Sequence, residues 1–144
     1  MYVRPFVPND LPAVSTIVRD SLRENYPTSI YLDIHKWWRD GFLVATLDGH
    51  PVGFVAAVVP SDGQARILML AVTESYRMRG IGSMLMDEFL KACGLRGLKR
   101  IELEVRTTNT GAIRFYQRYG FMISHTLPRF YTDGEDGYKM VRYF

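Results

Sequence analysis

The chain has 144 residues, of which 47% are hydrophobic and 23% are charged, and its formal net charge is +3. This composition, in a chain long enough to bury a core, excludes a disordered chain, a collagen and a coiled coil, and the single cysteine, Cys93, excludes a disulfide scaffold. No apolar run approaches the roughly 20 residues of a membrane span and no secretory signal is visible, so we expect one cytoplasmic domain over residues 1–144 that binds no membrane.

The first half of the chain mixes strands and helices. Its predicted elements are a strand over 2–7, a helix over 11–22, a helix over about 29–39, and strands over 42–47, 52–59 and 65–72. Asn9 or Asp10 is expected to cap the first helix. Asp48-Gly49-His50-Pro51 is typical of a hairpin turn, and the nearly continuous apolar run over 65–72 indicates a buried central strand.

The second half continues the same mixture. Its predicted elements are a loop over 73–82, a helix from there to about Cys93, a strand over 99–106, a helix over 110–119, and strands over 121–127 and 138–144. Gly94 and Gly97 are expected to end the first of these helices, and Gly120 the second. The whole pattern predicts one α/β layer fold.

The most informative segment is Arg77-Met78-Arg79-Gly80-Ile81-Gly82, between the buried strand and an amphipathic helix. Free backbone N–H groups and the helix dipole make such a junction suited to a phosphate, and glycines allow a close approach. No Lys-Ser/Thr pair follows and no third glycine is present, so this is neither a Walker A loop nor a dinucleotide fingerprint. The segment alone fits a packing turn as well.

Positive charge gathers in the same region. Nine basic residues face four acidic ones between Arg77 and Arg118. Such an excess suits an anionic partner, whether a nucleic acid or a phosphorylated cofactor, and equally a solvated surface. Because the aromatic residues cluster in core-like runs and do not alternate with Lys or Arg, we expect no direct nucleic-acid binding.

Several segments resemble one known family. Residues 77–82 match the Arg/Gln-x-x-Gly-x-Gly/Ala signature of the GNAT N-acetyltransferase superfamily. Downstream, Leu103-Glu104-Val105-Arg106, Asn109 and the run over 112–121 are similar to its later motifs in order and spacing. Residues 129–138 and 22–27 resemble the C-terminal hairpin and the substrate loop of protein N-terminal acetyltransferases, the RimI-like enzymes and the catalytic subunits of NatA-type enzymes.

This resemblance implies a GNAT (acyl-CoA N-acyltransferase) fold, a mixed, mostly antiparallel sheet with flanking helices and with strands splayed at the cofactor site. It implies acetyl-CoA as cofactor and direct transfer of acetyl to the N-terminal amine of a protein or peptide within a ternary complex. The residues that it places at the cofactor are Leu70, Ala71, Val72, Arg77, Met78, Arg79, Gly80, Ile81, Gly82, Ser83, Asn109 and Tyr116. Asn109 also fits a helix cap.

The chemistry favours an N-terminal amine, because its pKa is about 7.7–8.0, against about 10.4 for lysine, and only the neutral amine attacks. The resemblance makes Glu104 the candidate base and Tyr116 the candidate general acid, with backbone amides around Leu70 to Val72 stabilising an oxyanion. Read from the residues alone, Glu104 and Glu102 equally fit the solvent face of a strand, and Tyr116 fits a core aromatic.

The resemblance also assigns the peptide site to Glu24, Tyr26, Tyr131 and Tyr138. Where the related enzymes commonly carry paired tyrosines, this chain has Phe130-Tyr131, which leaves the preferred first residue of the substrate open. The three histidines are scattered without metal-ligand spacing, so we expect no metal.

The expected partners are a protein or peptide N-terminus as substrate and a ribosome or auxiliary subunit, with a monomer as default state. Two alternatives stay open: a GNAT enzyme acting on lysine or a small-molecule amine, and a non-catalytic acyl-CoA-binding subunit.

Overall fold

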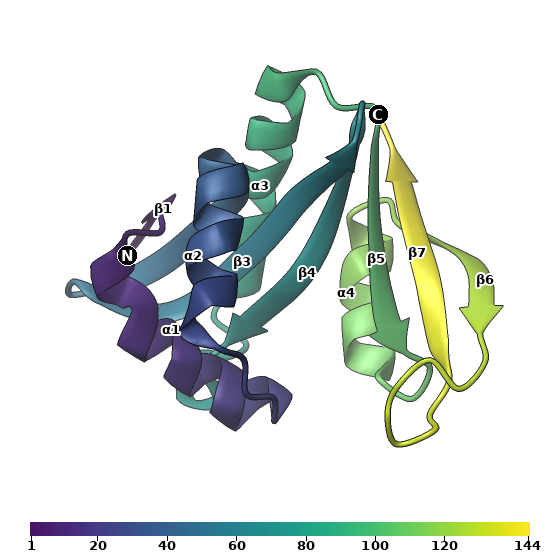
Figure 1. Cartoon of the computed structure of the whole chain (residues 1–144), viewed down its shortest axis with the longest axis horizontal. Coiled ribbons are helices and arrows are strands. Elements are labelled where there is room, and N and C mark those ends of the chain that lie inside the picture. The colour runs from purple at the N-terminus through teal and green to yellow at the C-terminus, as the bar shows by residue number, and fades with distance from the viewer.

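A seven-stranded sheet runs through the computed structural model, which describes all residues from Met1 to Phe144 (Figure 1). The strands are β1 (Tyr2–Pro5), β2 (Phe42–Leu47), β3 (His50–Ser61), β4 (Gln64–Val72), β5 (Arg100–Arg106), β6 (Met122–Leu127) and β7 (Gly137–Tyr143). Their order is β1-β2-β3-β4-β5-β7-β6, and every neighbouring pair is antiparallel except the parallel pair β4 and β5. The predicted mixed, mostly antiparallel sheet is confirmed.

Helices cover both faces of this sheet. They are α1 (Leu11–Ile17), which continues as a π-helical turn over Val18–Leu22, α2 (Thr28–Trp37), α3 (Ile81–Arg96) and α4 (Thr110–Arg118), with short 3-10 turns at Pro8–Asp10, Arg39–Gly41 and Glu74–Tyr76. The helices α1 and α2 bury one apolar cluster against β2–β4, and α3 and α4 bury a second on the opposite face (Figure 1). None of the helices is both long and apolar enough to cross a membrane.

The sheet opens between its two parallel strands. Only three residue pairs join β4 to β5, from Gln64 with Arg100 to Arg66 with Glu102, and beyond them the strands diverge (Figure 1). The register of β3 and β4 shifts at this point, because Ala56 pairs with Met69 while Ala57 pairs with Ile67, so Leu68 is an extra residue. A β-bulge bends its strand and increases the local twist. The bulge therefore coincides with the point where β4 leaves β5.

Two helix ends differ from the sequence-based prediction. The helix α3 passes through Gly94 and ends only at Gly97, whose φ of 74° is the left-handed conformation of a C-terminal cap. Asp10 stands directly before α1 but its side chain does not cap it. The carboxylate instead accepts hydrogen bonds from the Arg4 guanidinium, at 2.7 and 2.8 Å, and from the Val7 amide at 2.9 Å. An ion pair with β1 thus takes the place of the predicted cap.

Candidate active site

The C-terminal end of β4, the start of α3 and one side of α4 enclose a cavity of about 510 Å³, which we call the amide groove. It is lined by all but one of the residues predicted to bind the cofactor: Leu70, Ala71, Val72, Arg77, Met78, Gly80, Ile81, Gly82, Ser83, Asn109 and Tyr116. The exception is Arg79, whose guanidinium carbon lies over the ring of Tyr76, 5.3 Å from its centre. The loop and the helix start thus meet in one place.

The amides at the start of α3 face the groove without protein partners. Gly80 occupies the N-cap position, no side chain caps the helix, and the first amide bonded back to the cap is that of Met84, to the Gly80 carbonyl at 3.0 Å. The N–H groups of Ile81, Gly82 and Ser83 are left free, at the positive end of a 16-residue helix. This arrangement is suited to an anion such as a phosphate.

Glycine occupies the two positions of the loop for different structural reasons. Gly80 has a φ of 79°, and a Cβ atom placed there would have no neighbour within 4 Å. Glycine is therefore favoured at this position by the backbone conformation and not by a lack of space. At Gly82 a Cβ atom would lie 3.3 Å from the ring of Phe115. Gly82 therefore lets α3 and α4 approach each other closely. Arg77 fixes the loop from its other end, donating from Nε to the Val72 carbonyl at 3.0 Å.

Sequence reasoning missed several residues of the amide groove: Ser21, Leu22, Tyr76, Gly111, Ala112, Phe115 and Arg118. For two of those on α4 a signal existed, since Ala112 precedes Phe115 and Tyr116 by three and four residues, the spacings that place side chains next to each other on a helix. Ser21 and Leu22 come from the end of the first helical segment, and only the fold brings them there: the Ser21 hydroxyl donates to the Val72 carbonyl at 3.4 Å. Asn109 caps α4, its Oδ1 accepting from the Ala112 amide at 3.2 Å.

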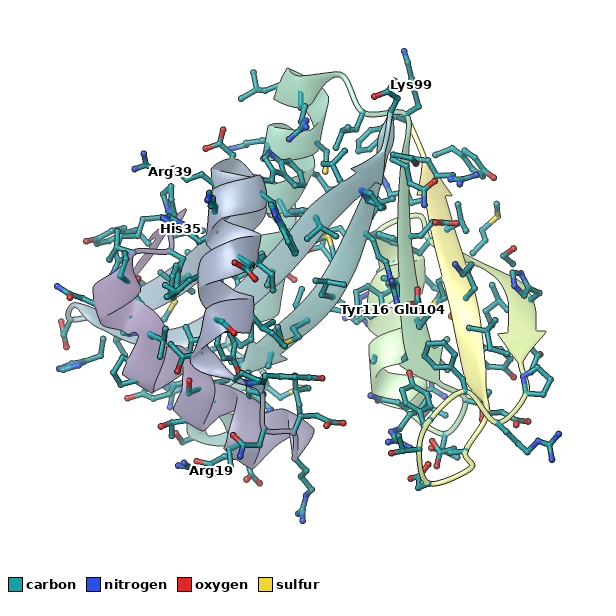
Figure 2. All side chains as sticks on the ribbon, in the orientation of Figure 1. Arg19, His35, Arg39, Lys99, Glu104 and Tyr116 are labelled. Atoms are coloured by element: carbon teal, nitrogen blue, oxygen red, sulfur yellow. The ribbon has the colours of Figure 1, made fainter.

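A second, smaller cavity of about 300 Å³ lies on the α2 side of the gap between β4 and β5. We call it the apolar cavity, and its lining residues are Tyr26, Ile30, Ile34, Arg66, Ile67, Leu68, Met69, Glu104, Phe130 and Tyr131. Ile101, Leu103 and Val105 of β5 pack into the α3 and α4 core, so the alternating Glu104 points to the other side. Figure 2 labels Glu104 and Tyr116 beside the gap, on β5 and α4.

Glu104 is not a solvent-facing residue. Its side chain is 9% exposed, its Oε1 accepts a hydrogen bond from Arg66 Nη2, and its Oε2 is buried without any partner. Glu102 is also buried, but Gln64 donates to it, and Arg100 and Lys139 lie 3.5 and 3.9 Å away. The interpretation of both residues as a solvated strand face is therefore wrong, because long-range partners cover them. Of the two, only Glu104 presents an unpaired oxygen at a cavity.

Tyr116 reaches the amide groove from α4 and is 8% exposed. Its ring packs edge-on against Phe121, with centroids 5.6 Å apart, so the core-aromatic interpretation describes part of its role. Burial raises the pKa of its phenol, and nearby Tyr131 raises it further. The hydroxyl therefore keeps its proton through the neutral pH range and is available as a donor.

Tyr131 forms part of the wall of the apolar cavity. Burial raises the pKa of its phenol, Arg106 lowers it, and Glu104 raises it. The Arg106 guanidinium holds this ring from β5, with its carbon 4.1 Å from the ring centre. The same guanidinium donates to the Asp133 carboxylate at 2.9 and 3.1 Å. The segment before β7 is thereby fastened to β5.

The other residues predicted for the peptide site fall in different places. Tyr26 lines the apolar cavity and packs edge-on against Tyr31. Glu24 is exposed in the loop before α2 and lines neither cavity. Tyr138 pairs with Val105 in the sheet and packs against the α3 and α4 core, so it points away from the apolar cavity. We therefore remove Tyr138 from the candidate peptide site.

No three His, Cys, Asp or Glu side chains lie close enough to hold a metal ion. Burial raises the pKa of the Cys93 thiol to about 12, which leaves it protonated and unreactive.

The comparisons with known proteins agree with this geometry. The family model for the acetyltransferase (GNAT) family matches residues 11–121. An N-alpha-acetyltransferase of Sulfolobus acidocaldarius is 33% identical over 145 residues, covering 92% of this chain and 86% of the relative.

Two solved structures share the fold over nearly the whole chain. Ard1 from Thermoplasma volcanium superposes with a TM-score of 0.94 at 43% identity, covering 98% of this chain and 95% of that one. Naa50 from Arabidopsis thaliana, in complex with the bisubstrate analogue CoA-Ac-MVNAL, superposes with a TM-score of 0.88 at 25% identity, covering 99% and 97%.

Proposed function

The chain belongs to the acetyltransferase (GNAT) family, and we propose that it transfers the acetyl group of acetyl-CoA to the α-amino group of a protein or peptide N-terminus. The observation that carries this proposal is the pair of cavities on the two sides of one gap in the sheet. One presents free helix amides for an anionic cofactor, and the other presents an unpaired carboxylate oxygen for an amine. The relative named N-alpha-acetyltransferase and the neighbour bound to a peptide-like analogue support the same acceptor.

The amide groove fits acetyl-CoA. The free amides of Ile81, Gly82 and Ser83 would hold its diphosphate, and Arg118 adds positive charge to the groove. Asn109 uses Oδ1 to cap α4, which leaves its amide NH₂ to donate toward the pantetheine arm. When bound, acetyl-CoA supplies an acetyl group activated as a thioester.

The acceptor amine needs only modest help. An α-amino group with a pKa of about 7.7–8.0 is roughly one-quarter neutral at pH 7.4. We assign to Glu104 the role of the base that accepts the proton lost by the attacking amine, directly or through one water molecule. Its Oε2 is the unpaired acceptor of the apolar cavity. Beyond Arg66 the edge of β4 has no β5 partner, so the amides around Leu70 to Val72 that do not bond to β3 are free to stabilise negative charge on the acetyl oxygen.

Tyr116 acts on the other side of the gap. Its phenol is protonated at neutral pH and lines the amide groove, where it would donate its proton to the sulfur of the departing coenzyme A, so that the thiolate leaves as a thiol. Both substrates are bound together in this scheme, and the acetyl group passes directly from one to the other.

The test compares acceptors and variants by release of the free thiol. Peptides with a free N-terminus should be acetylated, whereas the same peptides blocked at the N-terminus but carrying lysine, and a polyamine, should not. Glu104→Gln should lower kcat by about 100-fold. The matched control Glu102→Gln, which removes the same charge two residues away, should keep most of the activity. Acetylation of lysine or polyamine alone would contradict the proposal, and cofactor binding without any turnover would indicate a non-catalytic subunit.

We further propose that residues 1–144 form one cytoplasmic domain that is monomeric, in the sense that it does not pair with copies of itself. Its proposed partner is a ribosome or an auxiliary subunit. One sheet that contains all seven strands supports the single domain, and a buried, unpaired Cys93 suits a reducing compartment. Light scattering of the purified protein and fractionation of cells test the oligomeric state and the compartment.

A further inference from the structure

We infer that the apolar cavity receives the first side chain of the substrate and selects a large apolar residue there, such as methionine, leucine or phenylalanine. This inference rests on the proposed function and deepens it, since it names the class of N-terminus. Its basis is the composition, the size and the charge balance of the cavity.

The walls of the cavity are almost wholly apolar. Eight of its ten lining residues are aliphatic or aromatic, and four of them are large side chains that the protein leaves partly exposed. These four are Tyr26, Ile30, Leu68 and Phe130, with exposed fractions between 36% and 45%. Single exposed apolar side chains are ordinary, but four that converge on one cavity mark a binding surface. They come from separate segments of the chain, which only the fold brings together.

The local backbone explains why Leu68 faces this cavity. It is the extra residue of the bulge in β4, and a bulge re-aims the side chain that it carries. Phe130 adds an aromatic ring to the wall beside Tyr131, with ring centroids 5.0 Å apart, and it carries no hydroxyl. It therefore extends the apolar part of the wall.

The size of the cavity favours a large side chain. A volume of about 300 Å³ leaves ample room beside the peptide backbone, and a first residue such as alanine or serine would leave most of it without contacts. Filling it with the three additional heavy atoms of leucine or methionine removes apolar area from water on both partners. By the usual gain per buried methylene, such a substrate should have a kcat/KM at least roughly tenfold above that of the alanine peptide.

The charged groups of the cavity are few, and they are bonded to each other. Its only ionised groups are Arg66 and Glu104, which bond to each other, and the remaining oxygen of Glu104 is used by the substrate amine. Apart from the hydroxyls of Tyr26 and Tyr131 and the buried Nε of Arg66, the walls offer an entering hydroxyl or amide no hydrogen-bond partner, so most of its lost hydration is not replaced. An acidic side chain would in addition be repelled by the Glu104 carboxylate.

The experiment uses the full chain, acetyl-CoA and six peptides that differ only in the first residue: Met, Leu, Phe, Ala, Ser and Asp. Thiol release should be fastest for the three large apolar residues. Leu68→Ala and Phe130→Ala should each lower the ratio of Met-first to Ala-first kcat/KM several-fold, because both remove part of the apolar wall that a methionine side chain would contact. Leu68→Trp, which fills it, should shift the preference toward Ala and Ser.

Leu32→Ala is the matched control. Leu32 is 39% exposed on the same helix as Ile30 but does not line the apolar cavity, so this variant should leave the ratio unchanged. Thermal unfolding of each variant shows that it is folded. Equal rates for all six peptides, or highest rates for Ala or Ser, would overturn the inference while N-terminal acetylation itself stands. Fastest turnover of the Asp peptide would overturn it too, because it would show that the charge of Arg66 selects an acidic first residue. Turnover of none of the peptides would remove the proposed function and this inference together.

Discussion

Replacing Gly80 by alanine tests the role of the free amides at the start of α3. Gly80 has a φ of 79°, and a side chain there would meet nothing within 4 Å. The substitution therefore adds no steric clash with a neighbour and acts only on the backbone. An L-residue with a side chain pays about 1–2 kcal/mol in this conformation. Part of that cost is offset because alanine is also less free than glycine in the unfolded chain, by about 0.4–1 kcal/mol.

We therefore expect Gly80→Ala to lose about 1 kcal/mol of stability, which for a chain of this length lowers Tm by roughly 4 °C. The variant can relieve this strain by rotating the loop toward negative φ, which turns the amides of Ile81 and Gly82 away from the groove. Hydrogen bonds to a charged group contribute about 1.5–3 kcal/mol each. Losing one should raise the Kd of coenzyme A about tenfold or more, as measured by calorimetry.

Gly97→Ala is the control at the other end of the same helix. Gly97 has a φ of 74° and is equally free of neighbours, so alanine should cost the same stability there and leave the coenzyme A affinity unchanged. Gly80→Asn should be milder than Gly80→Ala, since asparagine tolerates the left-handed region. If Gly80→Ala and Gly97→Ala lose equal stability and bind coenzyme A equally well, the start of α3 is not the anion site.

Three further changes have distinct expected results. Tyr116→Phe should lower kcat by about 100-fold with little change in Tm, because the ring stays packed against Phe121; an unchanged kcat would remove the donor role. Arg106→Met frees the segment that carries Tyr131, so the peptide KM should rise several-fold while that of acetyl-CoA is constant in steady-state kinetics. For Asp10, burial alone would raise the pKa, but bonds from Arg4 and Val7 outweigh it and the pKa lies below its ordinary value. Its stabilising effect is thus present above about pH 4 and is lost as pH falls further. Asp10→Asn should cost about 2 kcal/mol at pH 7 in denaturant unfolding and flatten this acid dependence.

Local patterns predicted the parts of the site that depend on neighbours in sequence. The loop over 77–82 and the capping Asn109 could be predicted because their spacing and their positions at helix ends are visible in the sequence. Strand alternation placed Glu104 and Glu102 on one face, but it could not distinguish them. Their partners Arg66 and Gln64 lie 38 residues away in the chain, and only sheet pairing brings them together.

The failures have the same origin. Tyr138 resembles a peptide-binding residue by position in the motif, yet its side chain faces the core because the register of β7 sets it opposite Val105, and a shift of one residue exchanges the faces of a strand. The bulge at Leu68 leaves no mark in the apolar run over 65–72, since any aliphatic residue fits there. Asp10 is a good cap by composition, but the bidentate ion pair with Arg4 competes for its carboxylate.

The two cavities have no lining residue in common, although both border β4: residues 66–69 belong to one and 70–72 to the other. Changes in the acceptor wall at Leu68, Ile30 or Phe130 therefore leave the donor wall untouched. An enzyme built in this way can change its range of acceptor substrates through a few substitutions on one side, while the site for the activated acyl group stays the same.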